Sequence, residues 1–110
     1  MTRFNITLKE SVQFVNMCLS KMKGGEIFVP KIPSYKILDL AKAVAPQCTI
    51  NFIGTRPGEK IHEEMITIHD SKQTVDLGKY YAILSSDDKK TIKKYLSYNK
   101  GKVVNKNFSY

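Results

Sequence analysis

A short turn near the middle of the sequence carries the residues best suited to bind a charged ligand. In the run Gly54-Thr55-Arg56-Pro57-Gly58-Glu59-Lys60, a guanidinium and a carboxylate stand three residues apart on a turn stiffened by proline and glycine. A guanidinium can grip a phosphate through two parallel charge-assisted hydrogen bonds, and a carboxylate can accept hydrogen bonds from hydroxyl groups. The turn therefore predicts half of a binding site, which other residues must complete.

Both charged residues of this turn also have plainer interpretations. Arg56 could form a surface salt bridge, and Glu59 could be an acid near the start of a helix, stabilised by the helix dipole. Lys60 is interpreted as a solvated neighbour of Arg56 rather than as a ligand. Two elements are expected to position the turn, a short apolar strand over residues 50–53 and a helix that opens within residues 61–66.

A second polar cluster follows the turn but does not predict chemistry. His62, Glu63 and Glu64 match a zinc-binding HExxH helix only in part, because Ile66 stands where the second histidine is required. Neighbouring residues on a helix point about 100° apart, so the two glutamates cannot share one acid–base task. We therefore expect no metal site and no catalytic residue in this chain.

The elements before the turn are predicted from caps and periodicity. Thr7 and Glu10 have the spacing of a capping box, and a helix should run from there to Gly24 and Gly25. A strand is expected over residues 26–29, followed by a second helix that Ser34 caps and Pro46 ends. The stripe expected to pack the first helix consists of Leu8, Val12, Val15, Leu19 and Met22.

The elements after the turn are less regular. Residues 74–84 should be extended with a break near Gly78, and residues 87–96 should form a polar helix. Residues 99–110 should be irregular unless a partner orders them. Helices and strands thus alternate along the chain, and this order predicts an α/β fold in one small domain.

Positive charge is concentrated at the end of the chain. Residues 71–110 hold nine basic and three acidic side chains, which gives +6 of the total net charge of +8. Such a run is usually a solvated surface, and because no nucleic-acid-binding motif accompanies it we expect no nucleic-acid partner. A free-standing basic interaction module stays open as an alternative. The helix-spaced lysines are Lys89, Lys90, Lys93 and Lys94.

The cysteines and the hydropathy of the chain indicate its compartment. Cys18 and Cys48 lack metal-binding or redox spacing, and we expect both to be buried thiols in a reducing environment. No apolar run has the roughly 20 residues that span a bilayer. The expected location is the cytoplasm, without a membrane partner.

Three blocks together resemble a known family. They are the run Met1-Thr2-Arg3-Phe4, residues 24–34 and residues 56–60. In these blocks the chain resembles the C-terminal part of the inverting UDP-N-acetylglucosamine 4,6-dehydratases, which are extended short-chain dehydrogenases of surface polysaccharide and pseudaminic acid biosynthesis. The resemblance covers roughly residues 1–84, so we expect a substrate-binding region over 1–84 and a basic tail over 85–110. Asn5 and Thr55 depart from the family pattern.

The resemblance implies roles for individual residues. Arg56 would bind the UDP phosphates, and Glu59 would accept hydrogen bonds from hydroxyl groups, in particular those of the ribose. Arg3 would face the nucleotide-sugar cleft, although it could equally pair with a carboxylate of the fold. The ligand implied is UDP-N-acetylglucosamine, the substrate of the family.

The resemblance also implies what this chain leaves to another segment. In the family an N-terminal Rossmann domain holds NADP, and we expect this chain to be a fragment that supplies neither a glycine-rich cofactor turn nor a catalytic Tyr-x-x-x-Lys pair. The fragment alone should bind no cofactor and be inactive, with the Rossmann half acting in cis or in trans. A fragment of a UDP-N-acetylglucosamine epimerase of the same superfamily is the alternative, and homo-oligomers of the intact enzyme stay open.

Overall fold

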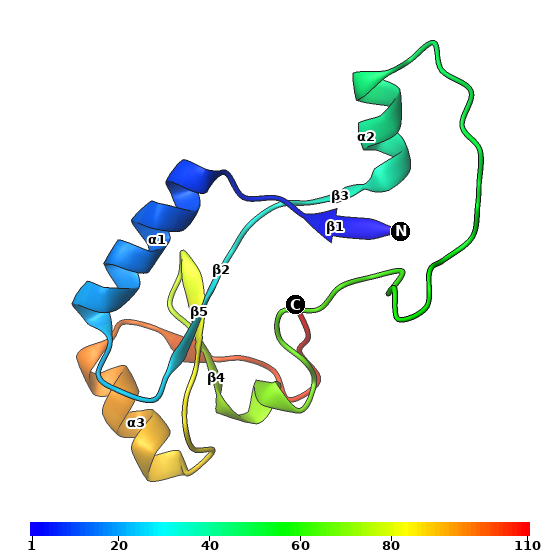
Figure 1. Ribbon diagram of the computed structural model, residues 1–110. Helices are drawn as coiled ribbons and strands as arrows, with labels where there is room; N and C mark the ends of the chain where they lie inside the picture. The colour runs from blue at the N-terminus through cyan, green and yellow to red at the C-terminus, as the bar shows by residue number, and fades with distance from the viewer. The chain divides into compact units, whose positions relative to one another are not determined.

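The computed structural model describes residues 1–110, and the chain passes back and forth between two units (Figure 1). The first unit consists of Met1–Ile6 and Ile32–Glu63, and the second consists of Thr7–Lys31 and Glu64–Tyr110. Each unit therefore combines segments that are distant in the sequence. The division predicted between residues 84 and 85 stays a prediction.

A four-stranded antiparallel sheet organises the second unit. Its strand order is β2 (Ile27–Pro30), β5 (Tyr80–Ile83), β4 (Thr74–Asp76) and β6 (Lys102–Val103). β4 and β5 form a hairpin whose turn contains Gly78 at φ 87°, a left-handed conformation that glycine adopts without strain. The predicted extended segment and its break near Gly78 are confirmed.

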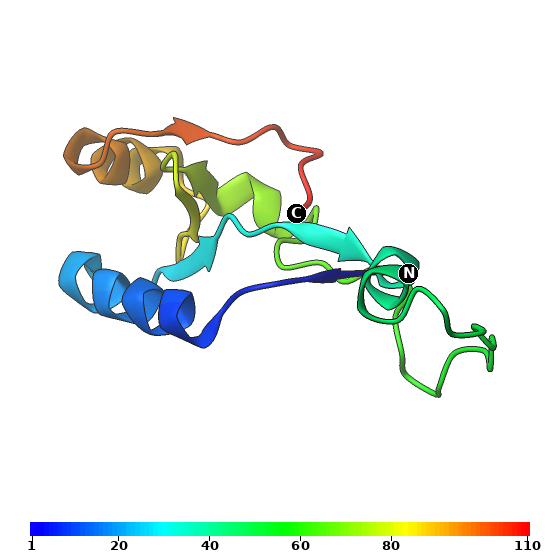
Figure 2. The ribbon, with the colours of Figure 1, turned by 90° about the horizontal axis from the view of Figure 1, so that it is seen from above.

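The two faces of this sheet are covered by different parts of the unit. On one face Ala82 and Val75 pack with Ile92 of α3 (Lys89–Tyr98), and α1 (Leu8–Lys21) lies on the same side (Figure 2). On the other face Tyr81 packs against Phe108 of the C-terminal segment, with ring centroids 5.1 Å apart. Both helices were predicted, and α3 begins after Asp88, whose carboxylate caps it.

The C-terminal segment is more ordered than the sequence predicts. β6 pairs with β4, and the backbone N–H of Tyr110 donates to the carbonyl oxygen of Ile66 at 2.9 Å. The expectation of an irregular end is wrong for β6 alone, because its partner is a distant strand that no local pattern reveals. The other residues of 99–110 form no helix or strand.

α1 starts as predicted, but its apolar stripe does not pack. Thr7 and Glu10 form a complete capping box. Leu8 and Leu19 are nevertheless 83% and 64% exposed, whereas Phe14 makes an edge-on contact with Tyr80 of the sheet. The expectation that the stripe lies in the core is wrong for this chain, and its apolar face is left open.

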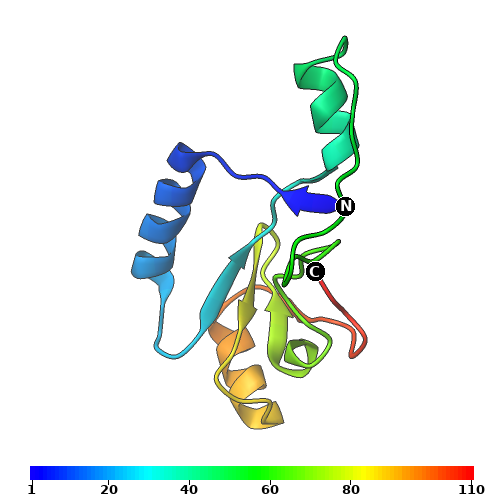
Figure 3. The ribbon, with the colours of Figure 1, turned by 45° about the vertical axis from the view of Figure 1, so that its right-hand side comes forward.

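The first unit is built on a two-stranded antiparallel ladder. β1 (Thr2–Phe4) pairs with β3 (Ser34–Lys36), and Arg3 stands opposite Tyr35 (Figure 3). α2 (Ile37–Val44) follows β3 directly, so the predicted helix exists and ends before Pro46. The predicted cap is wrong, because Ser34 belongs to the strand and Lys36 occupies the N-cap position without a side-chain hydrogen bond.

The two elements expected to flank the central turn are absent. Residues 50–53 form no strand, and residues 61–66 form no helix. A strand needs a partner ladder to satisfy its backbone, and this unit offers none there. Phe52 and Ile53 are instead 81% and 86% exposed. Cys18 and Cys48 are free thiols as expected, but Cys18 is only half-buried and Cys48 is exposed, so the predicted burial of both is wrong.

Candidate functional site

The central turn has a defined geometry despite its irregular flanks. The backbone N–H of Glu59 donates to the carbonyl oxygen of Arg56 at 3.0 Å, which closes a four-residue turn. Pro57 and Gly58 occupy its central positions, and Gly58 has φ 80°, as a type II turn requires. The Glu59 carboxylate folds back over this turn, where its Oε2 accepts from the Arg56 N–H at 3.0 Å.

Arg3 reaches the same carboxylate from the neighbouring strand. Its Nη2 lies 3.5 Å from Oε1 of Glu59, with the two side chains 24% and 31% exposed. Its Nη1 donates to the carbonyl oxygens of Thr2 at 2.7 Å and Ile61 at 3.4 Å. These bonds fix the direction in which the guanidinium leaves β1. Of the two roles foreseen for Arg3, pairing with a carboxylate of the fold is the one the structure shows.

The three residues predicted to bind ligand therefore lie together in the first unit. Glu59 links the side chain of Arg3 to the backbone of Arg56. The Arg56 guanidinium is exposed and makes no hydrogen bond or ion pair within the chain, so it does not form the alternative salt bridge. Two guanidinium groups against one carboxylate leave a net positive charge, which suits an anionic ligand.

Thr2 and His62 also hold this cluster, and the sequence did not single them out for this role. Thr2 Oγ1 lies 2.7 Å from His62 Nδ1, and the Thr2 N–H donates to the Ile61 carbonyl at 3.0 Å. The segment that follows the turn, residues 61–62, is thus hydrogen-bonded to β1. Spacing could not have revealed this contact, because the two residues are far apart in the sequence.

The arrangement can bind and orient a ligand, but it offers no reacting group of its own. No group of three His, Cys, Asp or Glu side chains could hold a metal ion. Gly24 and Gly25 connect the end of α1 to β2, whereas a dinucleotide-binding turn runs from a strand into a helix. These residues therefore do not fit the pyrophosphate of NADP.

One Tyr-x-x-x-Lys spacing does occur, contrary to the expectation from the sequence. Tyr98 and Lys102 stand four residues apart. Tyr98 is the last residue of α3 and Lys102 is the first residue of β6, so the helix does not place them one turn apart. The spacing therefore does not supply the paired side chains of a helix.

Comparison with known proteins identifies the family. A family described as polysaccharide biosynthesis protein matches residues 1–85. The chain belongs to this family. The chain is also similar to two enzymes of Campylobacter jejuni named UDP-N-acetylglucosamine 4,6-dehydratase (inverting). They are 54% identical over 86 residues (78% of this chain and 26% of the relative) and 46% identical over 114 residues (100% and 34%).

Further similarities extend to an epimerase and a solved structure. UDP-glucose 4-epimerase of Rickettsia canadensis is 41% identical over 87 residues, which cover 76% of this chain and 26% of that enzyme. The structure of Pen from Bacillus thuringiensis matches with a TM-score of 0.81 and 28% identity, covering 100% of this chain and 33% of that chain. The resemblance to the inverting dehydratases and the α/β class are confirmed. The chain spans about a quarter to a third of the curated relatives' length.

Proposed function

We propose that residues 1–84 form the nucleotide-sugar-binding region of an NADP-dependent UDP-N-acetylglucosamine 4,6-dehydratase of surface polysaccharide biosynthesis. Arg56 and Arg3 bind the diphosphate, and Glu59 accepts the ribose hydroxyl groups. One observation carries the proposal: the Glu59 carboxylate joins the Arg3 side chain to the Arg56 turn within one unit.

Arg56 is suited to the phosphates because its guanidinium has no partner in the chain. Pro57 and Gly58 fix the turn that carries it, so little backbone freedom is lost when an anion binds. A guanidinium can present two N–H groups to one phosphate, which a lysine cannot do. The neighbouring Lys60 would then add only a diffuse positive charge.

The Arg3–Glu59 pair is suited to exchange its partners for a ligand. At 3.5 Å, with both side chains partly exposed, the pair is long and solvated. Such pairs contribute only about 0–1 kcal/mol, so ligand groups can replace the contact at little cost. A ribose hydroxyl would donate to Glu59, and the released N–H of Arg3 would donate to a phosphate oxygen.

Chemistry in this proposal belongs to another segment, a Rossmann half that holds NADP and acts in cis or in trans. The open face of α1 supports a partner surface, because an apolar helix stripe in water is stabilised only by packing. Leu8, Val12, Val15 and Leu19 are between 52% and 83% exposed on this face. The intact enzyme would convert the nucleotide sugar to a 4-keto-6-deoxy sugar, and the present chain alone would be inactive.

The similarity to UDP-glucose 4-epimerases favours a second candidate, an epimerase of the same superfamily acting on UDP-N-acetylglucosamine. The two candidates share the nucleotide site and differ in product. Nuclear magnetic resonance (NMR) of the intact enzyme's product separates them, because a 4-keto-6-deoxy sugar indicates the dehydratase and an inverted hydroxyl group indicates the epimerase.

Equilibrium binding of UDP to the 110-residue chain tests the site itself. Arg56→Ala should weaken binding by about tenfold, the effect expected for the loss of a charge-assisted phosphate contact. Lys60→Ala removes one positive charge from the same turn and should change the affinity less than about twofold. Equal losses in both variants would show that general charge, not the Arg56 geometry, attracts the nucleotide.

A further inference from the structure

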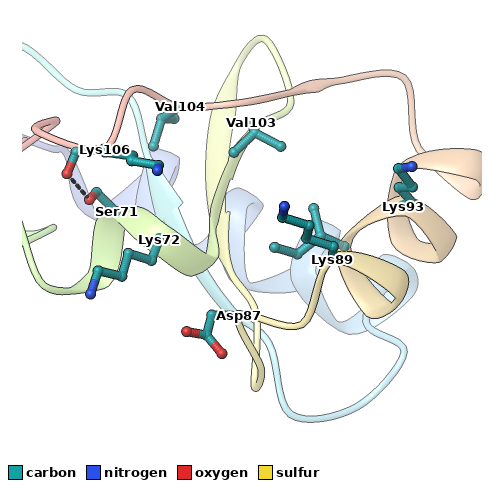
Figure 4. A pocket seen from close by; sticks show the side chains of 9 residues that line it. Ser71, Lys72, Asp87, Lys89, Lys93, Val103, Val104 and Lys106 are labelled. Carbon is teal, nitrogen blue, oxygen red and sulfur yellow. Dashed lines mark hydrogen bonds between the residues drawn. The ribbon is translucent and has the colours of Figure 1, made fainter.

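A cavity in the second unit has the features of a ligand site that is separate from the Arg56 turn. Its volume is about 420 Å³, within the range of small-molecule sites. Its apolar surface is formed by Ile92 of α3. Two valines of the C-terminal segment, Val103 and Val104, complete this surface (Figure 4). Val103 is 49% exposed, so about half of this apolar side chain is left uncovered by the rest of the chain.

The wall formed by the C-terminal segment is fixed by hydrogen bonds. Val103 pairs with Val75 in the sheet, and the Val104 N–H donates to the Thr74 carbonyl at 3.3 Å. The hydroxyl of Ser71, which is fully buried, lies 2.6 Å from the carbonyl oxygen of Lys106. The cavity is therefore formed before any ligand binds, which lowers the entropy cost of binding.

Charge around the cavity is strongly one-sided. Lys72, Lys89, Lys93 and Lys106 line it, against the single carboxylate of Asp87. Figure 4 shows Lys89 and Lys106 reaching in from opposite sides, whereas Lys72 is directed away. None of these four lysines forms an ion pair within the chain. An anionic group would thus find two ammonium groups above an apolar surface.

From this combination we propose that the cavity binds a small organic anion with an apolar body, such as a medium-chain carboxylate or an organic phosphate ester. The apolar body packs on Ile92, Val103 and Val104, and the anionic head lies between Lys89 and Lys106. The ligand needs both the apolar body and the anionic head. Solvated lysines alone bind an anion only weakly, and an apolar surface alone does not distinguish an anion from a neutral molecule.

The site is independent of the proposed nucleotide site. It lies wholly in the second unit, whereas Arg3, Arg56 and Glu59 lie in the first. Of its lining residues, only Ser71 and Lys72 fall within the residues 1–85 shared with the family. Loss of either site should leave the other intact, so failure of one proposal is distinguishable from failure of the other.

The test is an NMR titration of the ¹⁵N-labelled 110-residue chain with three probes. Octanoate carries both features, acetate carries only the anionic head and 1-octanol carries only the apolar body. Octanoate should produce saturable shifts at the amides of Ser71, Val103 and Val104, with an affinity at least about tenfold above either partial probe. Equal affinity for acetate and octanoate, or no saturable shift at these amides, would overturn the proposal.

A pair of neighbouring lysines supplies the matched variants. Lys89 lines the cavity, whereas Lys90, also in the first turn of α3, does not. Glutamate is favourable near a helix N-terminus, so both variants should fold. Lys89→Glu should weaken octanoate binding by about tenfold and Lys90→Glu by less than about twofold. The same loss in both variants would show that the basic surface, rather than the cavity, binds the probe.

Discussion

The Arg3 guanidinium and the Glu59 carboxylate meet at 3.5 Å, although 56 residues separate them in the sequence. This contact brings a strand near the start of the chain to the Pro57–Gly58 turn. Every residue proposed to contact the nucleotide either belongs to this ion pair or lies on the turn that Glu59 bonds to, as Arg56 does. The strength of the Arg3–Glu59 ion pair therefore indicates whether Glu59 mainly stabilises the fold or mainly binds the ligand.

Glu59→Gln should separate these two roles. The amide keeps the size of the side chain but removes the charge, and an exposed ion pair contributes only about 0–1 kcal/mol to stability. We expect the melting temperature of the chain to change little while UDP binding weakens several-fold. Thermal unfolding and calorimetric titration of the same sample measure both quantities, and a large drop in melting temperature would indicate a structural role.

Gly58→Ala should deform the turn without any steric clash. No atom lies within 4 Å of a Cβ added at this position, but its φ of 80° is unfavourable for alanine by about 1 kcal/mol. UDP affinity should fall because Arg56 and Glu59 lose their relative positions. Gly58→Asn is the control, since asparagine adopts positive φ more readily and should retain more of the affinity. Equal affinities in both variants and in the parent chain would argue against a role for the turn.

The capping box makes the stability of α1 depend on pH. Hydrogen bonds from the Thr7 hydroxyl and backbone N–H lower the pKa of Glu10 below its ordinary value of 4.5. Because the pKa of Glu10 is lower in the folded chain, the stabilisation that its carboxylate contributes is complete above pH 4.5. This stabilisation is lost as the pH falls through the pKa that Glu10 has in the folded chain. Helix content followed by circular dichroism should therefore decline in acid. Glu10→Gln should remove part of this decline, whereas Glu63→Gln, a substitution outside any helix, should not.

The open stripe of α1 should bind hydrophobic dyes without supporting the fold of the isolated chain. Val15→Asp should lower the fluorescence of an added naphthalene sulfonate dye and leave the melting temperature nearly unchanged, because Val15 is 55% exposed. Phe14→Ala, one residue away, should lower the stability by about 1 kcal/mol since it removes the ring contact with Tyr80. A larger stability loss for Val15→Asp than for Phe14→Ala would place the stripe in the core.

Local signals in the sequence predicted the elements that local interactions build. The predicted capping box at Thr7 and the predicted break near Gly78 are each satisfied by neighbours within a few residues. The cap at Asp88 is equally local, although only its helix was predicted. The Arg56–Glu59 turn belongs to the same class, because proline and glycine define it without help from distant residues.

Interactions between distant segments decided the rest. Residues 50–53 have the composition of a strand but lack a ladder partner, and Ser34 has the chemistry of a cap but joins β1 in a ladder. The Thr2–His62 hydrogen bond could not be foreseen for the same reason. The α1 stripe was recognised correctly as apolar, and only its burial was wrong, because periodicity does not say which surface covers a face.

The alternation of the chain between its two units has a consequence for proteolysis. Each unit is assembled from two separate lengths of polypeptide, Met1–Ile6 with Ile32–Glu63 and Thr7–Lys31 with Glu64–Tyr110. A single cut in the glycine loop after α1 would release neither unit, since β1 before the cut pairs with β3 after it and Phe14 of α1 contacts Tyr80 of β5. A nicked chain should migrate as one species under native conditions and separate into two only in denaturant.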